Sequence, residues 1–307
     1  MLLKNRYTGS MALIAVFCSL VWALPAQAEM TPDTVYEQAL QIEKEIELLR
    51  RYYKIVERNP SPPTAADLQP RHSWQRTYVI MVKLNLFRRK HGLVGFSPLT
   101  IEPTIDMNDS FTWAQTQRIL TEIGIIKQQL NITGEVSPVT PVQGRRQIDV
   151  FNLLKQIGYD MDSLNGEALT PSTVYAELRR INEDVNVIMS NTSTADVAFP
   201  PARIPDAIPK NSLDAAFALM EELKRMQRQL GMASIDFGPF YKTDNIVPAD
   251  VFMMVNMCFA ELQVIKAKLG LIHAITPPAE YQEGKIPADV VQLMGFLTNK
   301  LRQVNVH

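Results

Sequence analysis

Apolar residues recur along much of the chain at alternating spacings of four and three residues, the pattern of amphipathic helices that pack in a bundle. One such stripe comprises Val35, Ala39, Ile42, Ile46, Leu49 and Tyr53. Another comprises Val174, Leu178, Ile181, Val185 and Ile188. Stretches that alternate apolar and polar residues, such as residues 234–240, are short and broken by Pro or Gly. The pattern therefore predicts an all-α protein.

Most stripes are preceded by a proline beside a residue that can cap a helix. The segment TPDTVY at residues 31–36 returns as TPSTVY at 170–175, and VPADVF at 247–252 resembles IPADVV at 286–291. Proline suits the first helical turn because its φ angle is fixed and its missing N–H has no partner there. Several stripes end at a glycine followed by an apolar residue, as at Gly92, Gly231 and Gly270. These glycines predict left-handed helix caps.

The predicted helix starts are regularly spaced within each half of the chain, and a shorter spacing separates the halves between Val150 and Val174. They fall near Val35, Trp74, Thr112, Val150, Val174, Leu213, Val251 and Val290. The offset in sequence from Val35 to Val174 is the same as the offset from Gly92 to Gly231. We therefore expect about eight helices with a repeat of ~39 residues, arranged as a tandem duplication of a four-helix unit. The expected units are residues 29–165 and 166–307.

The predicted linkers are long and rich in proline. Examples are residues 59–70, 96–109, 133–146 and 274–287. Connections in helix bundles usually have about 2 to 8 residues. An extended linker of about 15 residues reaches about 50 Å, farther than the roughly 33 Å spanned by a helix of about 22 residues. Antiparallel bundles with loose loops are the expected arrangement, and parallel neighbouring helices are the alternative that this linker length permits.

Residues 1–28 have the features of a secretory signal peptide. Lys4 and Arg6 form a basic start, residues 11–24 are apolar, and Ala26-Gln27-Ala28 matches a cleavage site. A membrane-spanning helix needs about 20 apolar residues, so an uncleaved anchor is the less favoured alternative. We expect a bacterial periplasmic or secreted product, with no transmembrane segment after cleavage.

Composition narrows the class of protein further. The chain has 307 residues, a formal net charge of −1 and 46% hydrophobic residues, which is ordinary for a globular protein. A near-neutral chain offers no basis for nucleic-acid binding, which usually needs a basic domain or stripe. Two cysteines cannot build a disulfide-rich scaffold, and Cys258 alone remains once residues 1–28 are removed.

No catalytic constellation is recognisable in the sequence. It lacks the common nucleophile motifs and the glycine-rich phosphate loops. Its four histidines lack metal-binding spacing and are expected on the surface or at helix ends. Glu122 and Glu261 recur at equivalent positions of the two units and could form an acid–base pair, but exposed or lysine-paired glutamates are the preferred interpretation. We therefore expect a protein without enzymatic activity, catalytic residues or cofactor.

The predicted helix 251–269 is apolar on nearly every side. Its Met253, Met254, Met257 and Cys258 are soft ligands that suit Cu(I). Cys258 is the equivalent in the second unit of Ile119, a position on a core stripe, so a buried and unreactive thiol is the preferred interpretation. A helix that is apolar all round must be buried all round, so this helix should be central.

Aromatic residues gather at the predicted helix starts. The candidate binding residues are Tyr36, Trp74, Trp113, Phe151, Tyr175 and Phe252. In parallel helices they would lie at one end, where they could hold an extended chain or a flat ligand. We therefore expect an exported, non-enzymatic helical-repeat protein that binds an envelope protein or peptide. The alternative is a small-molecule or Cu(I) binding protein that uses helix 251–269.

Overall fold

The computed structural model describes residues 30–56, 64–95, 102–166, 169–278 and 281–306. Apart from Met30, these residues belong to one compact unit, Thr31–His307. The predicted signal peptide therefore lies outside the described residues. Within them the chain forms eight α-helices, one short 3-10 helix and no strand, which confirms the all-α class.

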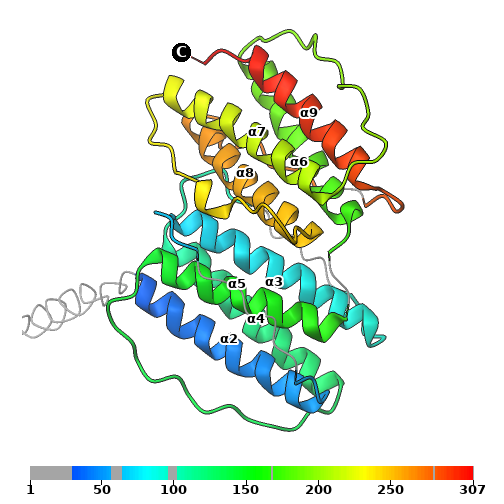
Figure 1. Cartoon of the computed structure of the whole chain (residues 1–307). Helices are drawn as coiled ribbons and strands as arrows, with labels where there is room; N and C mark the ends of the chain where they lie inside the picture. The colour runs from blue at the N-terminus through cyan, green and yellow to red at the C-terminus, as the bar shows by residue number, and fades with distance from the viewer. Residues whose placement is uncertain (1–29, 57–63, 96–101, 167–168, 279–280, 307) are drawn as a thin grey trace, which may run out of the picture. The chain divides into compact units, whose positions relative to one another are not determined.

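The eight α-helices are 17 to 21 residues long. They are α2 (Pro32–Tyr52), α3 (Pro70–Lys90), α4 (Asp109–Gln129), α5 (Gln147–Asn165), α6 (Pro171–Asn191), α7 (Pro209–Gln229), α8 (Pro248–Lys268) and α9 (Pro287–Gln303) (Figure 1). The short 3-10 helix η1 comprises Gly238–Phe240. As predicted, proline occupies the first turn of most of these helices, and Gly92, Gly231 and Gly270 have φ angles of 70°, 67° and 76°. The first residues of α2 and α6 keep the sequence offset that separates Val35 from Val174, although an origin by duplication stays a prediction.

The helices contact one another in two sets of four. In the first set α2 and α3 each contact both α4 and α5, and in the second α6 and α7 each contact both α8 and α9. Among the described residues, α2 makes no comparable contact with α3, nor α6 with α7, so α2 and α3 occupy opposite corners of the first set, as α6 and α7 do of the second. Helices α3 and α8 join the two sets.

All four helices of each set run in the same direction. Pro171, Pro209, Pro248 and Pro287, which begin the four helices of the second set, line one small depression. In the first set, the Arg145 amide before α5 lies 2.6 Å from Asp33 Oδ1 at the start of α2. Thr112 near the start of α4 donates to the carbonyl of Pro70, which begins α3, and Gln147 at the start of α5 donates to Asp109 at the start of α4. The expected antiparallel arrangement is therefore wrong.

The linkers explain this arrangement because they return along the outside of the bundle. Between α4 and α5, the Pro138 carbonyl accepts from Lys44 Nζ at 3.1 Å, and the Val142 amide donates to Glu37 at 2.9 Å. Residue numbers rise along this linker while they fall along α2, so the linker runs antiparallel to that helix. Figure 1 shows such long connections beside the helices. The linker between α4 and α5 thereby brings the chain back to the end where α4 began.

Helix α8 lies at the centre of the fold, as predicted. It contacts α6 and α7 of its own set and α3 of the other set, and nearly all its residues from Asp250 to Lys266 are buried. Among the described helices it is the one whose length and composition would suit a membrane span, but its apolar surface is packed inside the protein. The burial explains why its sequence has no polar face.

Candidate functional site

The six predicted aromatic residues lie in three separate clusters. Phe151, Tyr175 and Phe252 belong to the core of the second helix set, and Tyr36 and Trp113 pack on the core of the first. Trp74 is buried in a small third cluster with Tyr78 and Met107. Trp74, Phe151 and Phe252 are buried, so these side chains fill the N-terminal ends of the bundles and do not form one common surface.

The predicted soft-ligand residues are packed in the core. Met253, Met254, Met257 and Cys258 are all buried, and Cys258 has no disulfide partner. The Cys258 thiol donates to the Ala216 carbonyl at 3.6 Å, and burial raises its pKa well above the usual range. No group of three His, Cys, Asp or Glu side chains suited to a metal ion occurs in the described part of the chain. This packing fits the predicted buried and unreactive thiol.

The two candidate glutamates do not meet. Glu122 forms an ion pair with Arg88 of α3 at 3.0 Å, inside the first helix set. Glu261 accepts from Arg71 Nε at 2.8 Å and from His72 Nε2 at 2.7 Å, across the junction of α3 and α8. Although burial opposes ionisation, the hydrogen bond from His72 and the charge of Arg71 lower the pKa of Glu261 to about 2. Both glutamates therefore serve as ion-pair partners of arginines.

His72 lies at a helix end, as expected, but it is buried and not on the surface. Its Nδ1 atom accepts from the Gln69 amide at 2.9 Å, which caps the first turn of α3. Its Nε2 atom then carries the proton that is donated to Glu261. Burial lowers the pKa of His72, in agreement with this neutral tautomer.

A second buried charged group connects α3, α6 and the linker before α4. Arg180 Nη1 lies 2.8 Å from Glu177, and Arg180 Nη2 lies 3.3 Å from Glu102. The Tyr78 hydroxyl donates to Glu177 at 2.8 Å, and the Arg180 guanidinium lies 4.5 Å from the centre of the Phe259 ring. Burial raises the pKa of Glu102 to about 8, even though the charge of Arg180 acts in the opposite sense.

These contacts fix how the two helix sets meet. The pairs His72–Glu261 and Tyr78–Glu177 join residues 189 and 99 positions apart in the sequence. Buried hydrogen bonds between charged groups require a defined geometry because an unpaired partner is costly to bury. Sequence reasoning missed these pairs because no local spacing connects their members.

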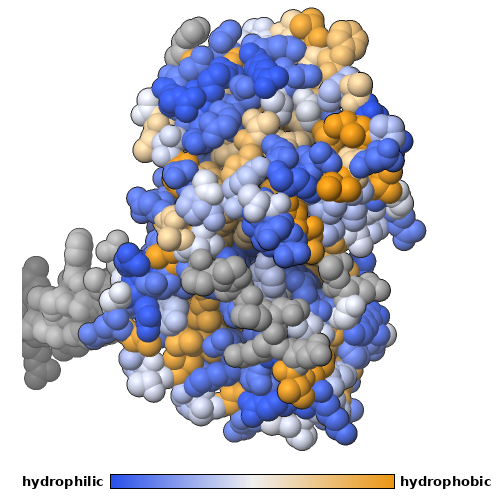
Figure 2. Space-filling view, in the orientation of Figure 1, coloured by the Kyte–Doolittle hydropathy of each residue, from blue (hydrophilic) through white to orange (hydrophobic). Residues whose placement is uncertain are grey.

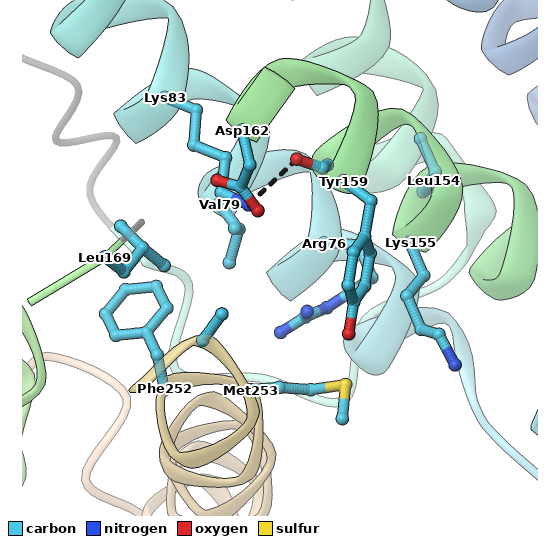
Figure 3. Close-up of a pocket in the computed structure, with 12 residues that line it drawn as sticks. Arg76, Val79, Lys83, Leu154, Lys155, Tyr159, Asp162, Leu169, Phe252 and Met253 are labelled. Atoms are coloured by element: carbon cyan, nitrogen blue, oxygen red, sulfur yellow. Dashed lines mark hydrogen bonds and ion pairs between the residues drawn. The ribbon is translucent and has the colours of Figure 1, made fainter. Parts of the chain in front are cut away.

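A basic pocket lies beside these contacts, between α3, α5 and α8. Figure 3 shows the Arg76 guanidinium pointing into the space between Tyr159, Phe252 and Met253. Lys83 Nζ donates to Asp162 at 2.8 Å along one wall. The pocket is open to solvent, and the empty space between its lining residues is about 370 Å³ only when the solvent at the opening is counted. We call it the Arg76 pocket.

An exposed apolar strip occupies the linker between α6 and α7. Its members are Val197, Phe199, Ile204 and Ile208, which are 67%, 80%, 47% and 58% exposed. We call these four side chains the linker strip. Figure 2 shows apolar side chains on the surface where this linker passes α9. The signal for this strip in the sequence is a set of apolar residues placed between the prolines of residues 197–209.

Polar side chains of α9 hold the backbone of this strip. The Val197 amide donates to Gln303 Oε1 at 3.2 Å, and the Phe199 carbonyl accepts from Asn299 Nδ2 at 3.2 Å. The Pro201 carbonyl accepts from Gln292 Nε2 at 3.0 Å. The linker therefore lies extended and antiparallel to α9, with its backbone fixed and its apolar side chains exposed.

No protein-family model, curated protein or solved structure matches this chain. The structure defines an all-helical protein built from two sets of parallel helices. What the protein does is therefore inferred from its own surface and cavities, of which the linker strip and the Arg76 pocket are the two with distinctive chemistry.

Proposed function

We propose that this protein is an exported, non-enzymatic helical protein that binds a protein or peptide in the bacterial cell envelope. The linker strip is the observation that carries this proposal. Phe199 is 80% exposed and Val197 is 67% exposed, on a backbone that α9 holds in place. Exposed apolar groups on an ordered segment favour association, because burying them removes apolar surface from water.

The strip is suited to a partner with an apolar groove. Aromatic side chains contribute strongly at protein interfaces, and full burial of one phenylalanine contributes about 1.5–3 kcal/mol. Because the backbone is already extended, a partner would spend little free energy on ordering it. The envelope location rests on the signal sequence expected in residues 1–28.

The alternative function, small-molecule binding, is favoured by one specific observation. Phe252 and Met253 of α8 line the Arg76 pocket, so the helix singled out by the sequence does contribute to a cavity. Met254, Met257 and Cys258 are fully buried in the core, which disfavours the Cu(I) form of this alternative.

The partner proposal can be tested with a photoreactive amino acid in the intact protein. We expect benzoylphenylalanine at position 199 to crosslink this chain to one envelope protein in the cells that make it. The same photoreactive group in place of the exposed Glu135 should give no crosslink to that protein. The purified partner should then bind the wild-type chain at least about tenfold more tightly than Phe199→Ser, since about 1.4 kcal/mol corresponds to tenfold.

The matched control is Ile275→Ser, which removes a 61% exposed apolar side chain from a different linker. It should leave the affinity unchanged. Equal crosslinking from positions 199 and 135, or equal affinity of Phe199→Ser and wild type, would show that the strip is not the binding surface.

A further inference from the structure

We infer that the Arg76 pocket binds a short aliphatic monocarboxylate, with the carboxylate on Arg76 and the hydrocarbon chain against α8. This site is separate from the linker strip and does not depend on the proposed partner. The inference rests on an unsatisfied buried cation, on the charge around it and on the apolar wall that faces it.

The Arg76 guanidinium has unused hydrogen-bond donors. The residue is 6% exposed, and its Nε and Nη2 atoms have no hydrogen-bond partner among the described residues. Its guanidinium lies 5.6 Å from the centre of the Phe151 ring, which supports the group without satisfying its donors. Burial lowers its pKa to about 10, so the side chain is still charged at neutral pH. Buried arginines normally have carboxylate partners, because a buried charge needs both neutralisation and hydrogen bonds.

The positions of the two unpaired nitrogen atoms of Arg76 define which ligand group would fit them. Nε and Nη2 form one edge of the planar guanidinium, and two parallel N–H groups on that edge match the two oxygens of a carboxylate. A carboxylate bound there would satisfy both donors at once. A halide ion would accept from them without that geometric match.

The charged side chains around the pocket favour the binding of a ligand with a single negative charge. The titratable side chains of the pocket lining are Arg76, Lys83, Lys155, Tyr159 and Asp162. Asp162 accepts from Lys83, and the neighbouring Asp250 accepts from Lys242 at 2.9 Å. Burial and the charge of Arg76 lower the pKa of Lys155 to about 8. A bound monoanion would neutralise Arg76, for which no ion pair with a carboxylate occurs among the described residues.

The opposite wall of the pocket is apolar. Phe252 and Met253 face Arg76 from α8, and Leu169 and Val79 close the side (Figure 3). Such a wall favours a ligand with a short hydrocarbon chain, because that chain removes apolar surface from water. Sulfate and phosphate carry more charge and have no apolar part to place against these side chains.

Calorimetric titration of the full-length purified protein tests the inference. Sodium butyrate is the probe, butyramide is its neutral counterpart of the same shape, and phosphate is the inorganic anion. We expect saturable binding of butyrate, with butyramide and phosphate each at least about tenfold weaker. Tight phosphate binding would identify a general anion site and overturn the carboxylate assignment. Equal binding of butyrate and butyramide would show that the carboxylate charge does not contribute to binding, and would overturn the inference.

Arg76→Met removes the donors but keeps an apolar side chain of similar length. We expect this variant to lose butyrate binding and to show no rise in melting temperature when butyrate is added, unlike wild type. Arg302→Met, which removes one positive charge from an exposed site on α9, should bind butyrate as wild type does. Unchanged binding by Arg76→Met would refute the site. If Arg76→Met fails to fold, the comparison of butyrate with butyramide on the wild-type protein still decides the question.

Discussion

His72 Nε2 lies 2.7 Å from Glu261 Oε1, and both side chains are fully buried where α3 meets α8. Arg71 approaches the same carboxylate at 2.8 Å, so one glutamate of the second helix set anchors the first turn of α3. The same histidine also accepts from the Gln69 amide that precedes α3. The start of a helix in one set is thereby fixed by a side chain of the other.

This anchor predicts a specific loss of stability in acid. The folded protein lowers the pKa of Glu261 from 4.5 to about 2, so its stabilising contribution is present above about pH 4.5 and is lost as the pH falls toward 2. The size of this contribution is on the order of 3 kcal/mol. Urea unfolding should show the loss between pH 5 and 2.5 in wild type, and a smaller loss in Glu261→Gln.

At pH 7 the Glu261→Gln variant should be about 3 kcal/mol less stable than wild type, because it removes the buried partner of Arg71 and leaves that side chain only the exposed Asp106 carboxylate at 2.9 Å. Glu135→Gln, at an exposed position on a linker, is the control and should behave as wild type. A Glu261→Gln protein with wild-type stability at pH 7 would contradict the role of this anchor.

Glu102 predicts the opposite pH dependence. Burial raises its pKa from 4.5 to about 8, so the folded protein holds a proton on this carboxyl at neutral pH. The associated stability is fully present below about pH 4.5 and is lost as the pH rises through about 8. Its full extent is on the order of 5 kcal/mol. Glu102→Gln resembles the protonated form, so it should unfold like wild type at pH 5 and be more stable than wild type at pH 9.

The measurement is the free energy of unfolding of both proteins in urea at pH 5, 7 and 9. A Glu102→Gln variant that is several kcal/mol less stable than wild type at pH 7 would mean that Glu102 is ionised and paired with Arg180. That result would leave the contact between Glu102 and Arg180 in place and would change only whether Glu102 carries a proton.

The helices were predictable from the sequence because their signals are local. Proline at Pro32 and Pro171 begins a helix, and Gly92 with its φ of 70° ends one, whatever the rest of the chain does. The central position of α8 was also predictable, because apolar residues surround this helix and leave it without a polar face. Helix direction was not, because long linkers permit both parallel and antiparallel neighbours.

The candidate site was less accessible to sequence reasoning. Arg76 stands among other polar residues of α3, and nothing in its neighbourhood distinguishes a buried arginine from a solvated one. The partners of Tyr78 and His72 lie 99 and 189 residues further along the chain. Such pairings follow from the packing of the two helix sets, which a single sequence does not encode in any short pattern.

The parallel arrangement predicts which cysteine pairs will form a disulfide. In a Cys258→Ser background, Asp33→Cys with Arg145→Cys should oxidise readily, because the Arg145 amide lies 2.6 Å from the Asp33 carboxylate. Asp33→Cys with Asn165→Cys should stay reduced, because α2 begins where α5 (Gln147–Asn165) also begins, not where it ends. Electrophoresis without reductant measures both. An antiparallel pair of helices would give the reverse result.

Gly295 predicts how the linker strip is held in place. A Cβ atom built on this residue of α9 would lie 2.7 Å from Pro201 Cγ, which is too close for a rigid proline ring. Gly124 of α4 is the matched control, because a Cβ there meets nothing within 4 Å. Alanine in an open helical position stabilises a helix by about 0.5–1 kcal/mol relative to glycine. We therefore expect Gly124→Ala to raise the free energy of unfolding by that amount.

Gly295→Ala should not gain this stability, because the new methyl group must push the 192–208 linker away from α9. The displaced linker would lose the hydrogen bonds of the Val197 amide to Gln303 and of the Phe199 carbonyl to Asn299. Hydrogen exchange of the Val197 amide should therefore become faster in Gly295→Ala and stay at the wild-type rate in Gly124→Ala. If Gly295→Ala were as stabilising as Gly124→Ala, with slow exchange at Val197, the linker would not be seated on α9. The ordered backbone on which the partner-binding proposal depends would then be lost as well.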